Sequence, residues 1–182
     1  EQTGIFVEKM ADFFRYNVKK GQEDATLGEE LESVDNYIYI LNVRFAGDIH
    51  FSKEADESLE HVRVPSMILQ PIVENAVNHG IRDIEWEGRI HLTVTGDADY
   101  IRISVKDNGK GMTQEQIESV LSGNKEYGKE ESDSTGIGMN NVISRLELYY
   151  EEKGLVEISS EGEGKGTEVV VYIPVNYSNF RK

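Results

Sequence analysis

Two short runs of alternating apolar residues, joined by a tight turn, place the strongest constraint on how this chain can fold. Residues 90–94 and 101–105 each carry an apolar side chain at every other position, and the polar turn 96–99 separates them. A period of two predicts strands, and so short a turn predicts an antiparallel hairpin. Two more such runs, 156–158 and 169–173, flank a glycine-rich turn. Hairpin-linked strands exclude a doubly wound parallel sheet, so the chain is predicted to be α+β.

Helical periodicity comes before these strands. Apolar residues step by three and four through residues 1–20 and again from Leu27 to Phe45, with a polar break over residues 21–26. The second seam spans about two and a half heptads. It fits a helix packed on its own domain, or a helical hairpin that dimerises. Further helices are expected over residues 65–80 (starting or bending near Pro71), over 113–121 (after a Thr-x-x-Gln capping box) and over 137–150.

Composition narrows the possible functions. The chain has 182 residues and a formal net charge of −15, which argues against binding to nucleic-acid phosphates or to an anionic membrane surface. It has no cysteine, which excludes disulfides, thiolate metal sites and cysteine nucleophiles. No apolar run reaches the roughly 18 residues that a membrane helix needs. The chain begins with Glu1 rather than Met, which favours a piece of a longer protein.

The helix that follows Pro71 separates apolar from polar side chains. At about 100° per residue, one arc is apolar and the opposite arc carries a carboxylate, two amides and an imidazole. The apolar arc contains Ile72, Val73, Ala76 and Val77, and the polar arc contains Glu74, Asn75, Asn78 and His79. Asparagine is a poor helix former, and its carbonyl oxygen suits Mg²⁺. The polar arc is therefore either a functional face or an ordinary solvated one.

Asp107 ends the second strand of the hairpin with the parity of its core-facing residues. A buried carboxylate needs a donor, and the exocyclic amine of adenine is one that would suit it. Gly109 and Gly111 follow at once and would allow a ligand to approach the backbone. The simpler interpretation is that Asp107 ends a strand and begins an Asp-x-Gly turn.

Two glycine-rich segments complete the set of candidates. Gly136 and Gly138 open the helix that follows a polar loop, where backbone amides and the helix dipole favour phosphate. The pattern is neither a Walker loop nor a dinucleotide fingerprint. The segment 162–167 lies between the last two strands and, taken alone, reads as a flexible hairpin turn.

The order of these four segments is more specific than any of them alone. Together they resemble the N, G1, G2 and G3 boxes of the Bergerat ATP-binding fold, which is shared by gyrase, the MutL mismatch-repair protein and sensor histidine kinases. The resemblance covers residues 62–175 and implies a two-layer sandwich: a mixed, mainly antiparallel sheet covered by helices, preceded by an N-terminal helical segment. The segments 70–80 and 136–142 resemble the LytS/YesM-like sensor histidine kinases of bacterial two-component systems, as does the segment 27–31.

That resemblance implies a role for each residue of the polar helix face. Asn75 would be the Mg²⁺ ligand, and Asn78 would lie near the phosphates, where the family often has lysine. His79 would lie along the nucleotide. Glu74 would polarise the attacking group. Gyrase-type ATPases carry their general base one turn before the Mg²⁺-binding asparagine, and this chain has Pro71 there.

The other boxes would surround the nucleotide. Asp107 would bind the adenine amino group, Gly109 and Gly111 would shape its pocket, and residues 113–135 would form a lid. Thr167 would support the adenine side. Contacts to the phosphates are implied for the start of the last helix, at Gly136, Ile137, Gly138 and Met139.

The same resemblance implies a division of the chain and a function. Residues 1–46 would be the end of a dimerisation and phosphoacceptor region with its linker helix, and residues 47–182 would be the ATP-binding catalytic domain. The activity would be transfer of the γ-phosphoryl of ATP·Mg²⁺ to a histidine and onward to a response regulator. The four histidines of the chain do not match the acceptor motif, so the acceptor is expected outside it.

Partners and location follow from the same resemblance. A homodimer is expected for the full-length protein, which would be membrane-anchored with this part in the cytoplasm, making no contact with the membrane or with nucleic acid. Two alternatives remain open. One is a gyrase- or MutL-type ATPase, and the other is a non-catalytic module that binds nucleotide to gate an interaction.

Overall fold

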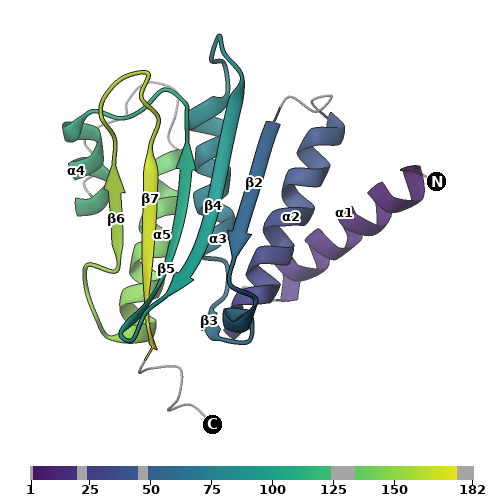
Figure 1. Cartoon of the computed structure of the whole chain (residues 1–182), viewed down its shortest axis with the longest axis horizontal. Coiled ribbons are helices and arrows are strands. Elements are labelled where there is room, and N and C mark those ends of the chain that lie inside the picture. The colour runs from purple at the N-terminus through teal and green to yellow at the C-terminus, as the bar shows by residue number, and fades with distance from the viewer. Residues whose placement is uncertain (1, 20–23, 45–48, 124–133, 176–182) are drawn as a thin grey trace.

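A computed structural model of the chain describes residues 2–19, 24–44, 49–123 and 134–175. Within these residues the main sheet has five strands. Figure 1 shows the second helix of the chain beside one edge of this sheet and the first helix against the second, on the side away from the sheet. In chain order the elements are α1 (Gln2–Lys19), β1 (Asp24–Thr26), α2 (Leu27–Arg44), β2 (Ile49–Ala55), the short 3₁₀ helix η1 (Glu57–Leu59), β3 (Arg63–Pro65), α3 (Leu69–Asn75), the π-helix η2 (Ala76–Ile81), β4 (Gly88–Gly96), β5 (Tyr100–Asp107), α4 (Gln114–Ser122), α5 (Ser134–Tyr150), β6 (Val156–Ser159) and β7 (Glu168–Pro174).

The sheet is mixed and mainly antiparallel, in the order β2-β4-β5-β7-β6. The predicted hairpin is β4 and β5, whose register pairs Leu92 with Val105 and Val94 with Ile103. β5, β7 and β6 continue the antiparallel pairing, and β2 joins the other edge in parallel with β4. The α+β class and the two-layer arrangement expected from the sequence are both confirmed.

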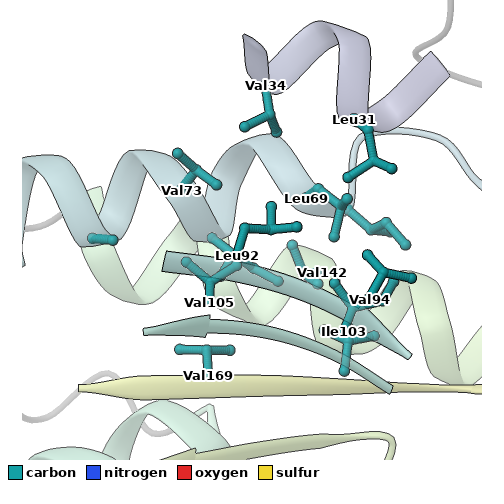
Figure 2. Packing of buried hydrophobic residues seen from close by; sticks show 14 of the residues in the cluster. Leu31, Val34, Leu69, Val73, Leu92, Val94, Ile103, Val105, Val142 and Val169 are labelled. Atoms are coloured by element: carbon teal, nitrogen blue, oxygen red, sulfur yellow. The ribbon is translucent and has the colours of Figure 1, made fainter. Parts of the chain in front are cut away.

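Helices cover one face of this sheet and enclose the core. Figure 2 shows labelled side chains from α2, α3, β4, β5, α5 and β7 gathered in the space between the helices and the strands. Along β4 the side chains alternate between buried and more exposed positions, as expected where one face of an antiparallel sheet packs and the other meets water. The alternation in the sequence therefore correctly predicted which face of β4 packs against the helices.

The heptad seam of α2 packs into that same core. Its apolar residues Leu27, Leu31, Val34 and Ile38 are all buried there. The first of the two sequence interpretations, a helix packed on its own domain, is therefore confirmed for α2. β1 was not predicted: part of the polar break forms this short strand, which pairs with β3, about 40 residues further along the chain. A three-residue strand with a distant partner leaves no local periodic signal.

The helix with Pro71 starts close to that residue, as predicted, and departs from the prediction only in its second half. It begins at Leu69, so Pro71 lies in the first turn, where its missing N–H does no harm. The apolar arc predicted for this helix is buried throughout. From Ala76 the backbone widens into a π-helix up to Ile81. Stretches of π-helix are rare and often occur at functional sites.

The remaining helices lie close to their predicted positions. Thr113 caps α4 through the expected capping box with Gln116. α5 begins at Ser134, three residues before the predicted start, so Gly136 as well as Gly138 lies within its first turns. Helix ends are commonly uncertain by a residue or two from sequence, and glycines obscure the start further. In the part of the chain that the structure describes, no helix is long and apolar enough to span a bilayer.

Candidate functional site

Asp107, the last residue of β5, lies next to the end of the π-helix. Only 6% of Asp107 is exposed, as its strand parity predicted. Its Oδ1 accepts a hydrogen bond from the Gly109 N–H at 2.8 Å, which is the Asp-x-Gly turn of the simpler interpretation. Burial raises the pKa of Asp107, and backbone hydrogen bonds from Gly109 and Thr167 partly offset that effect. The carboxylate is thus held in a dry environment that favours a further donor.

The glycines next to Asp107 are required by close backbone approaches. A Cβ on Gly109 would lie 2.0 Å from the Gly80 carbonyl oxygen, and a Cβ on Gly80 would lie 2.7 Å from the Asp107 carboxyl carbon. The Lys110 N–H donates to the same Gly80 oxygen at 2.9 Å. The end of the π-helix and the turn after β5 are therefore in direct contact.

The loop between β6 and β7 packs against Asp107 and the turn that follows it. The Gly166 N–H donates to the Gly109 oxygen at 3.1 Å, and the Asp107 N–H donates to the Thr167 oxygen at 2.9 Å. Gly111 adopts a φ of 72°, and a Cβ there would lie 2.0 Å from the Gly162 oxygen. Segments that begin near residues 80, 107 and 162 in the sequence are thus linked to one another by backbone hydrogen bonds and form one unit.

Ser160 organises this unit and was missed in the sequence. Its Oγ accepts from the Met112 N–H at 3.0 Å and donates to the Gly166 oxygen at 2.6 Å. It thereby ties the chain after Gly111 to the β6–β7 loop. A serine at the end of a strand belongs to no recognisable sequence motif, so only its hydrogen bonds to both segments reveal that it links them.

The polar helix face is only partly exposed. Glu74, Asn75 and His79 are half-buried, whereas Asn78 is exposed. The Asn75 Nδ2 atom is buried and has no hydrogen-bond partner among the described residues. Buried polar atoms are normally satisfied, so the Asn75 Nδ2 needs a hydrogen-bond acceptor that a water molecule or a ligand can supply.

His79 is held in its neutral form. Burial, and then the positive charge of Lys110, lower its pKa. A neutral imidazole at pH 7 offers one donor and one acceptor instead of a positive charge. His79 therefore adds no cation to balance phosphate charge.

The site offers a metal ion few protein ligands. Among the residues that the structure describes, no group of three His, Cys, Asp or Glu side chains could hold a metal ion. Mg²⁺ commonly takes one or two protein oxygens together with substrate phosphates and water. The atom of Asn75 that has no partner among the described residues is the Nδ2 donor, which suits an acceptor such as a phosphate oxygen, whereas Mg²⁺ would need the amide oxygen of Asn75 together with ligands from the nucleotide.

The start of α5 is described only in its backbone and in part of its side chains. The backbone at Gly136, Ile137 and Gly138 is helical, and Met139 is buried. The central part of the predicted lid, residues 124–133, lies outside the described residues, as does the side chain of Ile137. The implied phosphate contacts of this segment remain predictions.

A buried carboxylate on α2 holds the start of α3, and the sequence interpretation missed it. Glu30 is 1% exposed and accepts hydrogen bonds from the backbone N–H groups of Ile68 and Leu69, both at 2.9 Å, and of Met67 at 2.7 Å. The Tyr16 hydroxyl also donates to it. The available signal was position, because Glu30 comes directly before Leu31 and three residues after Leu27, at the edge of the apolar seam.

The four histidines occupy positions unlike that of a phosphoacceptor on a free helix face. His50 lies on β2, 2.9 Å from Glu87, and His91 lies on β4, with its ring hydrogen-bonded to Ser52. His61 lies in the turn before β3, and His79 is part of the π-helix. This arrangement agrees with the expectation that the acceptor histidine is not one of them.

Comparison with known proteins matches both parts of the chain. Residues 62–177 match the family described as histidine kinase-, DNA gyrase B- and HSP90-like ATPase, and residues 1–49 match the family described as histidine kinase. The sensor histidine kinase YpdA of Escherichia coli is 33% identical over 91% of this chain. The sensor protein kinase HptS of Staphylococcus aureus is 28% identical over 95% of it.

The fold likewise has solved counterparts. The mycobacterial sensor histidine kinase MprB superposes with a TM-score of 0.60 at 15% identity, covering 84% of this chain and 97% of the MprB chain. At that identity the likeness concerns the fold alone. The chain spans only 27% of the length of YpdA and 32% of that of HptS.

Proposed function

Because this chain belongs to the histidine kinase-, DNA gyrase B- and HSP90-like ATPase family, we propose that it is the ATP-binding catalytic part of a sensor histidine kinase. ATP with Mg²⁺ would bind beside Asp107 and the π-helix and donate its γ-phosphoryl group to a histidine on an adjoining helical domain. The N-terminal match to the histidine kinase family supports that reaction over other ATP-dependent ones.

The observation that carries this proposal is the environment of Asp107. A buried carboxylate with few donors gains most from one more, and the adenine 6-amino group is such a donor. Gly80, Gly109 and Gly166 leave no side chain between the carboxylate and the neighbouring backbones. Thr167 adds its backbone beside Asp107 and would line the adenine side of the pocket.

Asn75 would hold Mg²⁺ through its amide oxygen. When bound, Mg²⁺ neutralises phosphate charge and orients the γ-phosphoryl group for in-line transfer. Asn78, exposed one turn further on, would face the phosphates. The neutral His79 would lie along the nucleotide, and Gly111 would shape the rim of the pocket. The start of α5, from Gly136 to Met139, would offer its amides to the phosphates.

Glu74 would polarise the acceptor histidine. In the transfer, the bond between the γ-phosphorus and its bridging oxygen breaks, a phosphorus–nitrogen bond forms, and ADP leaves. One imidazole nitrogen attacks the phosphorus, and the other carries an N–H that donates a hydrogen bond to the carboxylate. This hydrogen bond makes the attacking nitrogen more nucleophilic and stabilises the positive charge that develops on the ring as the bond forms. Glu74 is half-buried next to Asn75, so it would lie beside the phosphate end of the site.

We also propose the organisation of the longer protein. Residues 1–46 would end its dimerisation and phosphoacceptor region, and residues 47–182 would be the catalytic domain, although α2 also packs into the core of that domain. A homodimer mate, a response-regulator receiver domain and a membrane anchor are proposals from the family. The relatives that the chain matches are about three times longer.

The alternatives predict different behaviour. A gyrase- or MutL-type ATPase needs a water-activating base, and Pro71 stands where that family carries it. A non-catalytic module would bind ATP·Mg²⁺ without transferring phosphate. Measuring hydrolysis and transfer in the same reaction separates all three.

The test is phosphoryl transfer from labelled ATP to a supplied helical domain that bears the acceptor histidine of a related sensor kinase. The parent chain should label that histidine, and Asn75→Ala should lose Mg²⁺-dependent ATP binding and transfer. Asn17→Ala is the matched control, because Asn17 also has a buried amide atom without a partner but lies on α1. A parent chain that binds no ATP·Mg²⁺ and labels nothing would contradict the proposal.

A further inference from the structure

A chain of hydrogen bonds runs from α2 to the proposed catalytic glutamate. The Ser33 hydroxyl donates to Gln70 Oε1 at 3.2 Å, and Gln70 Nε2 donates to Glu74 Oε1 at 2.9 Å. Ser33 and Gln70 are 3% and 6% exposed. The Ser33–Gln70 bond is therefore buried and the Gln70–Glu74 bond is partly buried, and shielding from water strengthens a hydrogen bond.

Which group donates and which accepts in these two hydrogen bonds follows from the chemistry of the side chains. An ionised carboxylate only accepts hydrogen bonds, so the amide NH₂ of Gln70 must face Glu74. Its oxygen then faces Ser33, whose hydroxyl must donate. A flipped Gln70 would place its oxygen against the Glu74 carboxylate, two acceptors in contact, so Glu74 determines the orientation of the amide and the Ser33 hydroxyl adapts to it.

A second residue of α2 lies beside the same carboxylate. Burial, and then the charge of Glu74, raise the pKa of Tyr37, so its hydroxyl stays protonated. The ring of Tyr37 stacks on Phe13 of α1 at a centroid separation of 5.9 Å. α2 thus lies along one side of Glu74, and Gln70 connects α2 to the Glu74 carboxylate.

We propose that Gln70 is a positioning residue that orients the Glu74 carboxylate for phosphoryl transfer, with Ser33 of α2 holding Gln70 in place. The inference rests on the proposed function, because it assigns Gln70 a part in that reaction. Gln70 would not touch nucleotide or acceptor. It would restrict the rotation of Glu74, which lies four residues later on the same helix face.

The experiment compares Gln70→Leu with the parent chain in the transfer reaction with ATP·Mg²⁺ and the supplied acceptor domain. Losing one hydrogen bond to a charged group should slow transfer by about tenfold or more. The affinity for ATP·Mg²⁺ should stay within about twofold, since Gln70 has no contact with the nucleotide. Ser33→Ala should give a smaller loss in the same direction. Tyr100→Phe, which removes a 2.8 Å hydrogen bond to Glu152 at the other end of β5, is the control that should keep the parent rate.

A double variant separates positioning from a general effect on stability. If Gln70 acts through Glu74, then adding Gln70→Leu to Glu74→Ala should slow transfer no further than Glu74→Ala alone. Losses that multiply, an unchanged rate in Gln70→Leu, or a loss of ATP·Mg²⁺ affinity equal to the loss of rate would overturn the positioning role. A parent chain that transfers nothing would overturn the proposed function and this role with it, whereas an active parent with fully active Gln70→Leu overturns the role alone.

Discussion

At the scale of single residues, Asp107 shows how a site can oppose stability. Its burial in the contact between β5 and the π-helix disfavours the charged form, and the Gly109 N–H compensates only in part. The folded-state pKa is therefore raised above the ordinary value of 3.8. Such a group costs stability wherever it is ionised in the folded chain, and the ligand donor proposed for this site would offset that cost.

Asp107→Asn should therefore separate stability from binding. The asparagine oxygen can still accept from Gly109, but its NH₂ meets the adenine amino group donor to donor, so ATP affinity should fall by about tenfold or more. At pH 7.5 the variant should be as stable as the parent or more stable. Urea unfolding at several pH values measures this.

The pH dependence has a definite sign. A raised carboxyl pKa destabilises the parent above that pKa, so the advantage of the variant should be full at neutral pH. It should shrink as pH falls through the raised pKa and vanish below about pH 4. An advantage that grows on acidification, or unchanged ATP affinity, would contradict the assignment of Asp107.

At the scale of elements, α3 depends on α2 for its start. Ile68, at the N-cap of α3, provides no side-chain hydrogen bond, and the Glu30 carboxylate of α2 receives the free N–H groups instead. A negative charge also suits the positive end of a helix. Because Tyr16 of α1 donates to the same carboxylate, three helices meet at Glu30.

Glu30→Ala should destabilise the chain by about 3 kcal/mol or more, since it leaves the backbone donors at residues 67–69 without their shared acceptor. Glu30→Gln should cost less, because its remaining oxygen can still accept. The exposed Glu32 on the same helix is the matched control, and Glu32→Ala should change the free energy of unfolding by no more than about 0.5 kcal/mol. Equal urea midpoints for the two alanine variants would show that the cap contributes nothing.

At the scale of the whole molecule, the charge balance determines how a nucleotide can bind. The net charge of −15 repels a polyphosphate. The residues gathered at the site are mainly amides, glycines and a neutral imidazole, with Lys110 exposed at its edge. If ATP binds at the proposed site, we expect that a divalent cation must neutralise much of its phosphate charge.

Chelating Mg²⁺ should therefore weaken ATP binding by about tenfold or more, as measured by calorimetry with and without EDTA. Adenosine is the control ligand, because it meets Asp107 but carries no phosphate, so its affinity should be the same in both conditions. ATP that binds equally well in EDTA would show that protein groups neutralise the phosphates without the metal.

Much of this architecture follows from local patterns. Alternation over residues 90–94 and 101–105 determines the central hairpin, because a strand buries every second side chain. The apolar steps of α2 and the capping box at Thr113 belong to single helices and need no distant partner. The burial of Asp107 also follows from its parity in β5.

Only the tertiary structure decided the contacts between segments far apart in the sequence. The role of Glu30 becomes evident only when α3 brings its free N–H groups to that carboxylate, and the role of Gln70 only when Ser33 of α2 bonds to it. The contact of Gly80 with Gly109 likewise arises where the end of the π-helix, the turn after β5 and the β6–β7 loop meet. The sequence by itself therefore determined the elements, their buried faces and the residue types of the site, because these depend on periodicity. Which residues complete one another depends on distances that folding alone sets.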